Sequence, residues 1–352
     1  VESQLIILPF FAIALGIPLS FATERAVAID AVLQASKICK TVFNTLVTSD
    51  TLVKKDKSPV TIADFSAQAV ANTLIYKVFP NDQIVGEESS EDLKGDSGKE
   101  MRDKVLSLAN SVLETPLSEQ ELLEVIDRGT YAGGSTGRMW TIDPIDGTLG
   151  FLSGEKGQFA VGISLIIDGV VHLSVIGCPN YPVDFKNPEG EKGVAFIAVK
   201  GQGAFQRKYS STEETPIHMA EISSTSEARA LGSLEADNAD HDEHGKIASL
   251  LEMTKEPLRM HSMCRYCAVC RGDANIFIRL PYNVNYEEKI WDHAPGSLLV
   301  AETGGVVTNM DGEPLNFTLG RTFGKPNKGF VIAHSNIHAQ VLEAVQKVMY
   351  NK

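Results

Sequence analysis

The chain has 352 residues, 43% of them hydrophobic and 22% charged, with a formal net charge of −13. This composition predicts a soluble globular protein that is long enough for two domains. The negative charge argues against DNA, RNA or an anionic membrane as a partner, although a small anionic substrate is compatible with bound cations that reverse the field locally. The odd set of 5 cysteines does not suggest a disulfide framework, which favours a reducing compartment.

Residues 1–21 differ from the rest of the chain. They are mostly apolar but include Pro9, Gly16 and Pro18, and no basic residue precedes the apolar stretch. The segment therefore lacks the charged start of a secretory signal, and it is marginal as a membrane span. We expect a cytoplasmic protein that does not enter the membrane, with organellar targeting by this segment as the alternative.

Two helices are expected at the start of the globular part. Apolar residues at helical spacing predict the first helix over residues 23–48. The run Thr61–Asp64 matches a capping box, so the second helix is expected to begin at Thr61 and to end near Phe79.

A sheet is predicted after the second helix. A short strand over residues 83–86 leads to the pair Glu87 and Glu88. The acidic stretch 90–138 is expected to be a surface insertion with a helical centre, where Ser118 and Glu121 match a second capping box. A hairpin turn is expected at Asp168-Gly169. Further strands are predicted over residues 140–142, 159–167, 170–178 and 194–200. Such sequential hairpins indicate an antiparallel sheet, so residues 22–216 are expected to form an α+β domain.

The pattern changes after about Pro216. Short predicted strands (229–232, 274–279 and 329–333) alternate with helical stretches (244–254, 292–303 and 337–349). Alternation of this kind predicts an α/β domain, which would span residues 217–352.

Five carboxylates fall at predicted strand ends and helix starts, beside turn or capping residues: Asp64, Glu87, Asp143, Asp146 and Asp292. Pro144 favours an extended backbone at Asp143. The carboxylates of Asp143 and Asp146 and the carbonyl of Ile145 are therefore expected to face one point. Oxygen-only ligands of this kind suit Mg²⁺ or Mn²⁺.

Gly147 and Thr148 follow these carboxylates directly. A helix that starts here would direct free N–H groups at an anion. Carboxylates for a metal beside N–H groups for a phosphate are what metal-assisted phosphoester hydrolysis requires. Each motif alone has a plainer interpretation, since residues 143–147 are typical of a turn and Asp292 is suited to capping a helix. Their joint occurrence is what favours a site.

The chain resembles the lithium-sensitive, Mg²⁺-dependent phosphatases that include inositol monophosphatase. The match rests on Gly86-Glu87-Glu88-Ser89, Asp143-Pro144-Ile145-Asp146-Gly147-Thr148 and Trp291-Asp292. Within that superfamily the chain is most similar to the 3′(2′),5′-bisphosphate nucleotidases, through Lys57–Thr61, Gly150–Leu152, Arg279–Pro281 and Glu288–His293. The resemblance implies a layered α/β/α/β/α sandwich, with α+β and α/β parts, of the inositol monophosphatase and fructose-1,6-bisphosphatase type.

The resemblance also implies up to three Mg²⁺ ions, which Mn²⁺ could replace. The implied ligands of the first ion are Glu87, Asp143 and the carbonyl of Ile145. The implied ligands of the second are Asp143, Asp146 and Asp292, and a third ion would lie near Glu87. By the same similarity, Asp64 and Thr148 would orient the attacking water and accept its proton, which is a general-base arrangement. Inhibition by Li⁺, and also by Na⁺, is implied as well.

The implied substrate is 3′-phosphoadenosine 5′-phosphate (PAP), which would give AMP and phosphate, with its sulfated form PAPS as a second substrate. The N–H groups of Gly147 and Thr148 would take the scissile phosphate. The implied nucleotide contacts are His241, Ser262, Arg265 and Arg279. Arginines suit a second phosphate that lies away from the metals, because the guanidinium forms a fork. We expect the protein to be a monomer.

The chain departs from the family pattern at several positions, three of which concern charged residues. Leu149 stands where the family usually has lysine, Ser153 where it has arginine, and Arg265 where it has lysine. These changes affect the expected substrate affinity rather than the metal ligands. Two alternatives stay open: a phosphatase of inositol phosphates or of a sugar bisphosphate, and a catalytically inactive metal or nucleotide sensor with the same fold.

Cys264, Cys267 and Cys270 have a spacing that resembles iron–sulfur ligation. No fourth cysteine follows them, and the stretch is expected to be helical. Buried thiols are therefore the favoured interpretation, with redox modification of an exposed thiol as the alternative.

Overall fold

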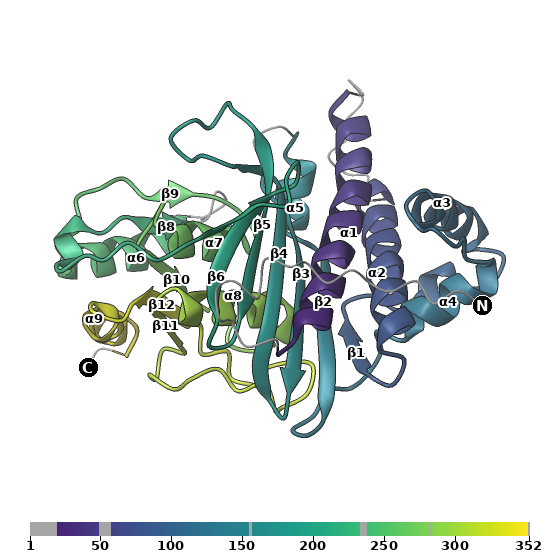
Figure 1. Cartoon of the computed structure of the whole chain (residues 1–352). Helices are drawn as coiled ribbons and strands as arrows, with labels where there is room; N and C mark the ends of the chain where they lie inside the picture. The colour runs from purple at the N-terminus through teal and green to yellow at the C-terminus, as the bar shows by residue number, and fades with distance from the viewer. Residues whose placement is uncertain (1–19, 49–57, 155–156, 233–237, 282, 351–352) are drawn as a thin grey trace.

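The structure, a computed structural model, describes residues 20–48, 58–154, 157–232, 238–281 and 283–350 (Figure 1). The apolar segment predicted over residues 1–21 lies outside the described residues except for its last two. Within the described part of the chain, no helix combines the length and the apolar character needed to cross a bilayer.

The first sheet has seven strands, paired in chain order: β1 (Gln83–Gly86), β2 (Arg138–Asp146), β3 (Ala160–Ile167), β4 (Val170–Pro182), β5 (Lys192–Val199), β6 (Gly203–Lys208) and β7 (Glu214–Pro216). Strands β2 to β7 pair antiparallel, whereas β1 pairs with β2 in parallel. The predicted antiparallel sheet is confirmed, although β6 and β7 were not predicted as strands. The β3–β4 hairpin turns at Asp168 and Gly169, whose φ angles of 50° and 76° are those that a two-residue turn of this kind requires.

The second sheet has five strands in the order β11-β12-β10-β8-β9. Their bounds are β8 (Ala230–Gly232), β9 (Leu258–Arg259), β10 (Ile276–Arg279), β11 (Gly305–Thr308) and β12 (Phe330–His334). Strand β12 is antiparallel to both β10 and β11, while β8 is parallel to β10 and β9.

The α-helices are α1 (Ala22–Thr48), α2 (Ser58–Val78), α3 (Lys99–Asn110), α4 (Glu119–Asp127), α5 (Thr148–Leu152), α6 (Asn238–Leu250), α7 (Cys264–Arg271), α8 (Ile290–Glu302) and α9 (His338–Tyr350). They form layers with the two sheets (Figure 1). Helices α1 and α2 cover the outer face of the seven-stranded sheet, α7 and α8 lie between the sheets, and α6 and α9 cover the five-stranded sheet. The predicted α/β/α/β/α sandwich is confirmed.

Helix α8 packs against both sheets and so joins the middle layer to its neighbours. Its side chains are buried on almost every side, including Trp291, Leu299 and Val300, as is typical of a helix enclosed by protein. The hydrophobic cluster around it draws on both sheets and on α7. Gly296 allows a close approach to α7, because a Cβ at this position would lie 2.2 Å from the ring of Tyr266.

The predicted insertion between β1 and β2 folds as two helices, α3 and α4, which pack beside α2 (Figure 1). The capping box at Ser118 is confirmed: the Ser118 hydroxyl accepts from the N–H of Glu121, and the Glu121 carboxylate accepts from the N–H of Ser118. The insertion also adds its own small core against α2, with Leu122 and Ile126 fully buried.

Two expectations near the predicted carboxylates are wrong. Helix α2 begins at Ser58 rather than at Thr61, because Pro59 fits the first turn of a helix, where its missing N–H is not needed. Asp64 therefore lies inside the helix rather than in a capping box. Strand β2 continues to Asp146 where a turn was expected, and a bulge shifts its register between Asp143 and Asp146.

Candidate active site

The predicted carboxylates come together from four separate elements. Asp64 lies on α2, Glu87 follows β1, Asp143 and Asp146 lie at the end of β2, and Asp292 lies in the first turn of α8. Ligand oxygens of Asp64, Glu87 and Glu88 lie within 4.8 Å of one another.

Asp143 is central to this carboxylate cluster. It is buried, and the negative charges of four other carboxylates act on it: Glu87, Asp146, Asp292 and Asp64. The bulge in β2 is what brings Asp143 and Asp146 to the same cluster although they are three residues apart in one strand.

The cluster strongly favours protonated acids in the absence of a cation. Burial raises the pKa of Asp143 well above its ordinary value, and the charge of Glu87 raises it further. Burial and the charges of Glu87 and Glu88 raise the pKa of Asp64 in the same way. Desolvation by the surrounding protein, together with the charges of Glu88 and Asp146, raises the pKa of Glu87 to about 7. A divalent cation would remove this repulsion.

Unpaired oxygens provide a separate test of whether these residues fit a metal. Asp64 Oδ1 and Asp143 Oδ1 are buried and have no hydrogen-bond partner in the described part of the chain. Buried polar atoms are normally paired, and burying one without a partner is costly. An all-oxygen set with free buried oxygens fits a hard divalent cation such as Mg²⁺.

The position of Glu87 depends on two residues that the sequence did not indicate. The Gln68 side chain hydrogen-bonds both backbone groups of Glu88, at 2.7 and 2.8 Å. The Arg321 guanidinium donates to the carbonyl of Gly86 and, at 3.0 Å, to that of Tyr131. These contacts join segments far apart in the sequence, so no local pattern could have revealed them.

The turn after β2 meets the turn before α7. Gly147 has a φ of 89°, and a Cβ there would lie 2.7 Å from Cβ of Ser262, so only glycine fits. The Asp146 carboxylate accepts a hydrogen bond from the backbone N–H of Met263. The structure thus brings the predicted substrate residues Gly147, Thr148 and Ser262 to the edge of the carboxylate cluster.

The two predicted arginines also lie beside the cluster. The Arg265 guanidinium stacks on the ring of Phe277 at 4.7 Å, and its positive charge lowers the pKa of Asp146 against the effect of burial. Burial and the charge of Arg279 lower the pKa of Arg265 to about 10. The predicted contact His241 belongs to α6, but its side chain lies outside the described part of the structure.

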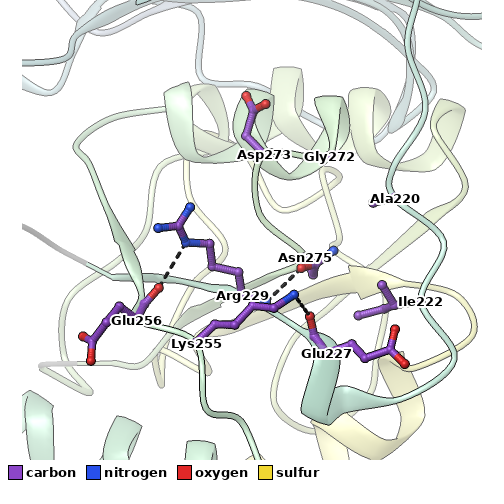
Figure 2. Close-up of a pocket in the computed structure, with 9 residues that line it drawn as sticks. All are labelled: Ala220, Ile222, Glu227, Arg229, Lys255, Glu256, Gly272, Asp273 and Asn275. Carbon is purple, nitrogen blue, oxygen red and sulfur yellow. Dashed lines mark hydrogen bonds between the residues drawn. The ribbon is translucent and has the colours of Figure 1, made fainter. Parts of the chain in front are cut away.

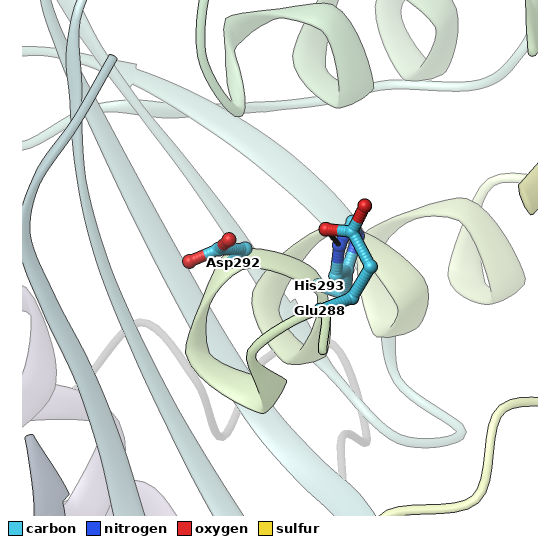
Figure 3. A group of neighbouring side chains, drawn as sticks. All are labelled: Glu288, Asp292 and His293. Atoms are coloured by element: carbon cyan, nitrogen blue, oxygen red, sulfur yellow. Dashed lines mark hydrogen bonds and ion pairs between the residues drawn. The ribbon is translucent and has the colours of Figure 1, made fainter. Parts of the chain in front are cut away.

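A second group of titratable side chains lies next to Arg279. Glu288 and His293 contact each other, and Asp292 lies on the other side of the first turn of α8 (Figure 3). Glu288 forms a bidentate pair with Arg279, with distances of 2.9 and 3.0 Å. Glu288 was part of a matched motif, but its pairing with Arg279 was not predicted.

A separate hollow of about 580 Å³ lies at the C-terminal end of α7, where Gly272 and Asp273 line it (Figure 2). The two basic side chains that line it donate to backbone carbonyls: Arg229 to that of Glu256, at 3.1 Å, and Lys255 to that of Glu227. None of the predicted site residues lines it, so the carboxylate cluster is the candidate site.

All five cysteines are buried, which confirms buried thiols and leaves no exposed thiol for redox modification. Cys178 on β4 lies 3.7 Å from Cys267, Sγ to Sγ. Burial raises the pKa of Cys267 to about 11 and that of Cys270 to about 12. In the described residues these thiols do not form a three-ligand group.

Comparisons with known proteins agree with this geometry. The model of the inositol monophosphatase family matches residues 22–350. A protein of Schizosaccharomyces pombe named 3′(2′),5′-bisphosphate nucleotidase is 42% identical over 344 residues, which cover 94% of this chain and 97% of that protein. A protein of the same name from Emericella nidulans is 40% identical, covering 94% and 99%. An inositol monophosphatase structure from Staphylococcus aureus shares the fold, with a TM-score of 0.61 at 17% identity and coverage of 94% and 95%.

Proposed function

The chain belongs to the inositol monophosphatase family, and from this premise we propose that it is a Mg²⁺-dependent phosphatase that hydrolyses PAP to AMP and phosphate. The observation that carries the proposal is the meeting of five carboxylates from four elements, with buried oxygens of Asp64 and Asp143 left unpaired. Such a cluster is costly unless cations occupy it. The relatives named 3′(2′),5′-bisphosphate nucleotidase support the choice of substrate.

The metal ligands follow from the cluster. Glu87, Asp143 and the Ile145 carbonyl would hold a first Mg²⁺, and Asp143, Asp146 and Asp292 a second, with a third and weaker ion near Glu87. When bound, the ions would supply an activated water and would stabilise the leaving oxygen. The central position of Asp143 supports its role as a shared ligand.

The catalytic residues would be Asp64 and Thr148. Asp64 is buried, its Oδ1 is unpaired, and the short helix α5 that begins with Thr148 packs against α2, which carries Asp64. The Thr148 hydroxyl would orient the attacking water and pass its proton toward Asp64. The N–H groups of Gly147 and Thr148 would hold the scissile phosphate.

The substrate would carry its second phosphate toward Arg265 and Arg279, with Ser262 and His241 as further contacts. Two guanidiniums beside an acidic metal centre suit a substrate with two separate anionic groups. PAPS, which shares the 3′-phosphate, would be a second substrate.

Phosphate release from PAP, PAPS and inositol 1-phosphate by the purified protein, with and without Mg²⁺, tests the proposal. We expect Mg²⁺-dependent release with a clear preference for PAP. Asp143→Asn and Asp146→Asn should each reduce turnover by at least about 100-fold, because each removes a metal ligand. A preference for inositol 1-phosphate would instead favour the inositol phosphatase alternative, and activity that survives both substitutions would exclude this site.

Millimolar Li⁺ should inhibit turnover, since a small monovalent ion would occupy a weakly held Mg²⁺ position. A chain that binds Mg²⁺ and PAP but releases no phosphate would be the inactive sensor. The monomeric state and the cytoplasmic location stay predictions, which size-exclusion chromatography and localisation of the tagged full chain would check.

A further inference from the structure

Glu288 is a buried carboxylate that is fully engaged by its neighbours. It is only 2% exposed. It accepts hydrogen bonds from Arg279 Nε at 2.9 Å and Nη2 at 3.0 Å, and from Asn327 Nδ2 at 3.2 Å, and it pairs with His293 Nε2 at 3.3 Å. A charge buried at this depth is tolerated only when it is paired, and its partners are fixed in return.

A metal-binding role for Glu288 fits these contacts poorly. Ligand atoms of Glu288, Asp292 and His293 do lie within 4.8 Å of one another. However, both oxygens of Glu288 are already hydrogen-bonded, and His293 Nδ1 pairs with the hydroxyl of Tyr266 at 2.8 Å. Figure 3 shows Glu288 and His293 against each other, with the Asp292 carboxylate directed elsewhere.

The ion pair with Glu288 orients Arg279 and still leaves N–H donors of its guanidinium for a substrate phosphate. An arginine side chain has five N–H donors, and the pair with Glu288 uses two of them, which leaves three. The side chain of Arg279 is 26% exposed, whereas that of Glu288 is 2% exposed. The Arg279 charge acts on both Asp146 and Asp292, so the guanidinium lies beside the carboxylate cluster.

Without Glu288, the guanidinium would lose its carboxylate partner, while the charges of Asp146 and Asp292 would still act on it. Opposite charges a few ångströms apart attract strongly in a partly buried site, so a released Arg279 would turn toward Asp146 or Asp292. There it would no longer be available to the second phosphate of the substrate.

We propose that Glu288 is a positioning residue that holds Arg279 in place for the second phosphate of a nucleoside bisphosphate and away from Asp146 and Asp292. Tyr266, His293 and Asn327 keep Glu288 in place. This inference rests on the function proposed above, and it adds a residue that acts on substrate selection without touching the reacting phosphate.

The test compares PAP with adenosine 3′-monophosphate, which has the same scissile phosphate but no second one. We expect Glu288→Gln to raise KM for PAP about ten-fold while kcat stays within about three-fold, because a ten-fold change corresponds to about 1.4 kcal/mol of binding. The kcat/KM for adenosine 3′-monophosphate should change by less than about three-fold. Equal losses on both substrates would overturn the proposal.

The matched control is Asp273→Asn. Asp273 pairs with Arg271 at 2.7 Å, the two side chains are 10% and 9% exposed, and the pair lies at the opposite end of α7 from Arg265. This substitution breaks a comparable ion pair and should leave the preference between the two substrates unchanged. If it altered the preference as Glu288→Gln does, the effect would be a general loss of stability.

A second variant keeps the test decisive if Glu288→Gln folds poorly. Arg279→Lys retains the charge but loses the fork, and it should show the same selective rise in KM for PAP. In the Arg279→Ala background, Glu288→Gln should raise KM for PAP by less than about two-fold, because the two residues act as one unit.

If the wild-type protein does not prefer PAP, the proposed function fails. If it does prefer PAP and both variants keep that preference, the roles of Glu288 and of the Arg279 fork are excluded, while the proposed reaction stands.

Discussion

The Gln68 amide pairs with both backbone groups of Glu88: its Nε2 donates to the carbonyl at 2.7 Å, and its Oε1 accepts from the N–H at 2.8 Å. Gln68 is fully buried on α2, one turn after Asp64. The helix that carries one carboxylate of the cluster therefore also fixes the backbone beside another, Glu87.

Gln68→Met should weaken both folding and metal binding. It removes two hydrogen bonds to buried backbone, which should lower the free energy of unfolding by about 2–3 kcal/mol. It should also weaken Mg²⁺ binding roughly ten-fold, the usual effect of losing a residue that orients a ligand. Denaturant unfolding and calorimetric titration with Mg²⁺ measure the two quantities.

Asn72→Leu is the control for that variant. Asn72 is also fully buried, lies one turn further along α2, and donates to the carbonyl of Val125 at 2.7 Å, away from the carboxylates. It should lose stability but keep the wild-type affinity for Mg²⁺. Equal weakening of Mg²⁺ binding in both variants would show that the Gln68 effect is not local.

The metal-free protein should become less stable as the pH rises. A carboxyl whose pKa is raised in the folded state stabilises folding below its ordinary pKa, and that stability is lost as the pH passes the raised value. For Glu87 this window runs from about 4.5 to about 7. In EDTA, Glu87→Gln should therefore raise the unfolding midpoint by about 2–5 °C at pH 8 relative to the wild type, with little change at pH 4.

Saturating Mg²⁺ should reverse this trend, because the ions pair with the charged acids. Wild-type melting curves between pH 4 and pH 8, with EDTA or with Mg²⁺, provide the measurement. The same difference between Glu87→Gln and the wild type at both pH values would show that the Glu87 charge does not cause the effect.

Substitutions should separate the catalytic pair from the metal ligands. Asp64→Asn or Thr148→Val should lower kcat by about 10²–10⁴, the usual contribution of a general base. Both should keep most of the rise in melting temperature on adding Mg²⁺, whereas Asp143→Asn should lose it. Loss of that rise in Asp64→Asn would identify Asp64 as a metal ligand instead.

Leu149→Lys should increase the affinity for PAP. Leu149 is 54% exposed in α5, directly after Thr148. A cation here would attract the substrate phosphates. An attraction of about 1 kcal/mol, which is typical of charges near a solvent-exposed surface, corresponds to a KM roughly five-fold lower. The gain should shrink in high KCl, because salt screens exposed charges. Leu149→Gln, which is polar but uncharged, should leave KM unchanged.

The sequence predicted the antiparallel hairpins of the first sheet well, because they depend on local patterns. The Asp168-Gly169 turn and the Ser118 cap were correct for the same reason. The start of α2 was misplaced because Pro59 is accepted in a first turn, which outweighed the capping pattern at Thr61.

The parts that could not be predicted are those that depend on pairing across the chain. The register shift in β2 lies between Asp143 and Asp146 and includes Pro144, which cannot donate to the ladder, but its exact place is seen only in the pairing with β3. The contacts of Gln68, Arg321 and Glu288 join segments that only the fold brings together. Their residue types are common at surface or helix positions, and only their contacts in the folded chain reveal their role.

The buried thiols can report when the layers of the protein separate, because a reagent reaches them only in an open state. Cys178 on β4 and Cys267 on α7 meet inside the middle of the sandwich, where burial keeps the pKa of both thiols high. A thiol-labelling reagent can react with them only when α7 separates from the seven-stranded sheet. The labelling rate at these two sites therefore measures how often the two halves of the active site part, and a bound substrate that touches both should slow it.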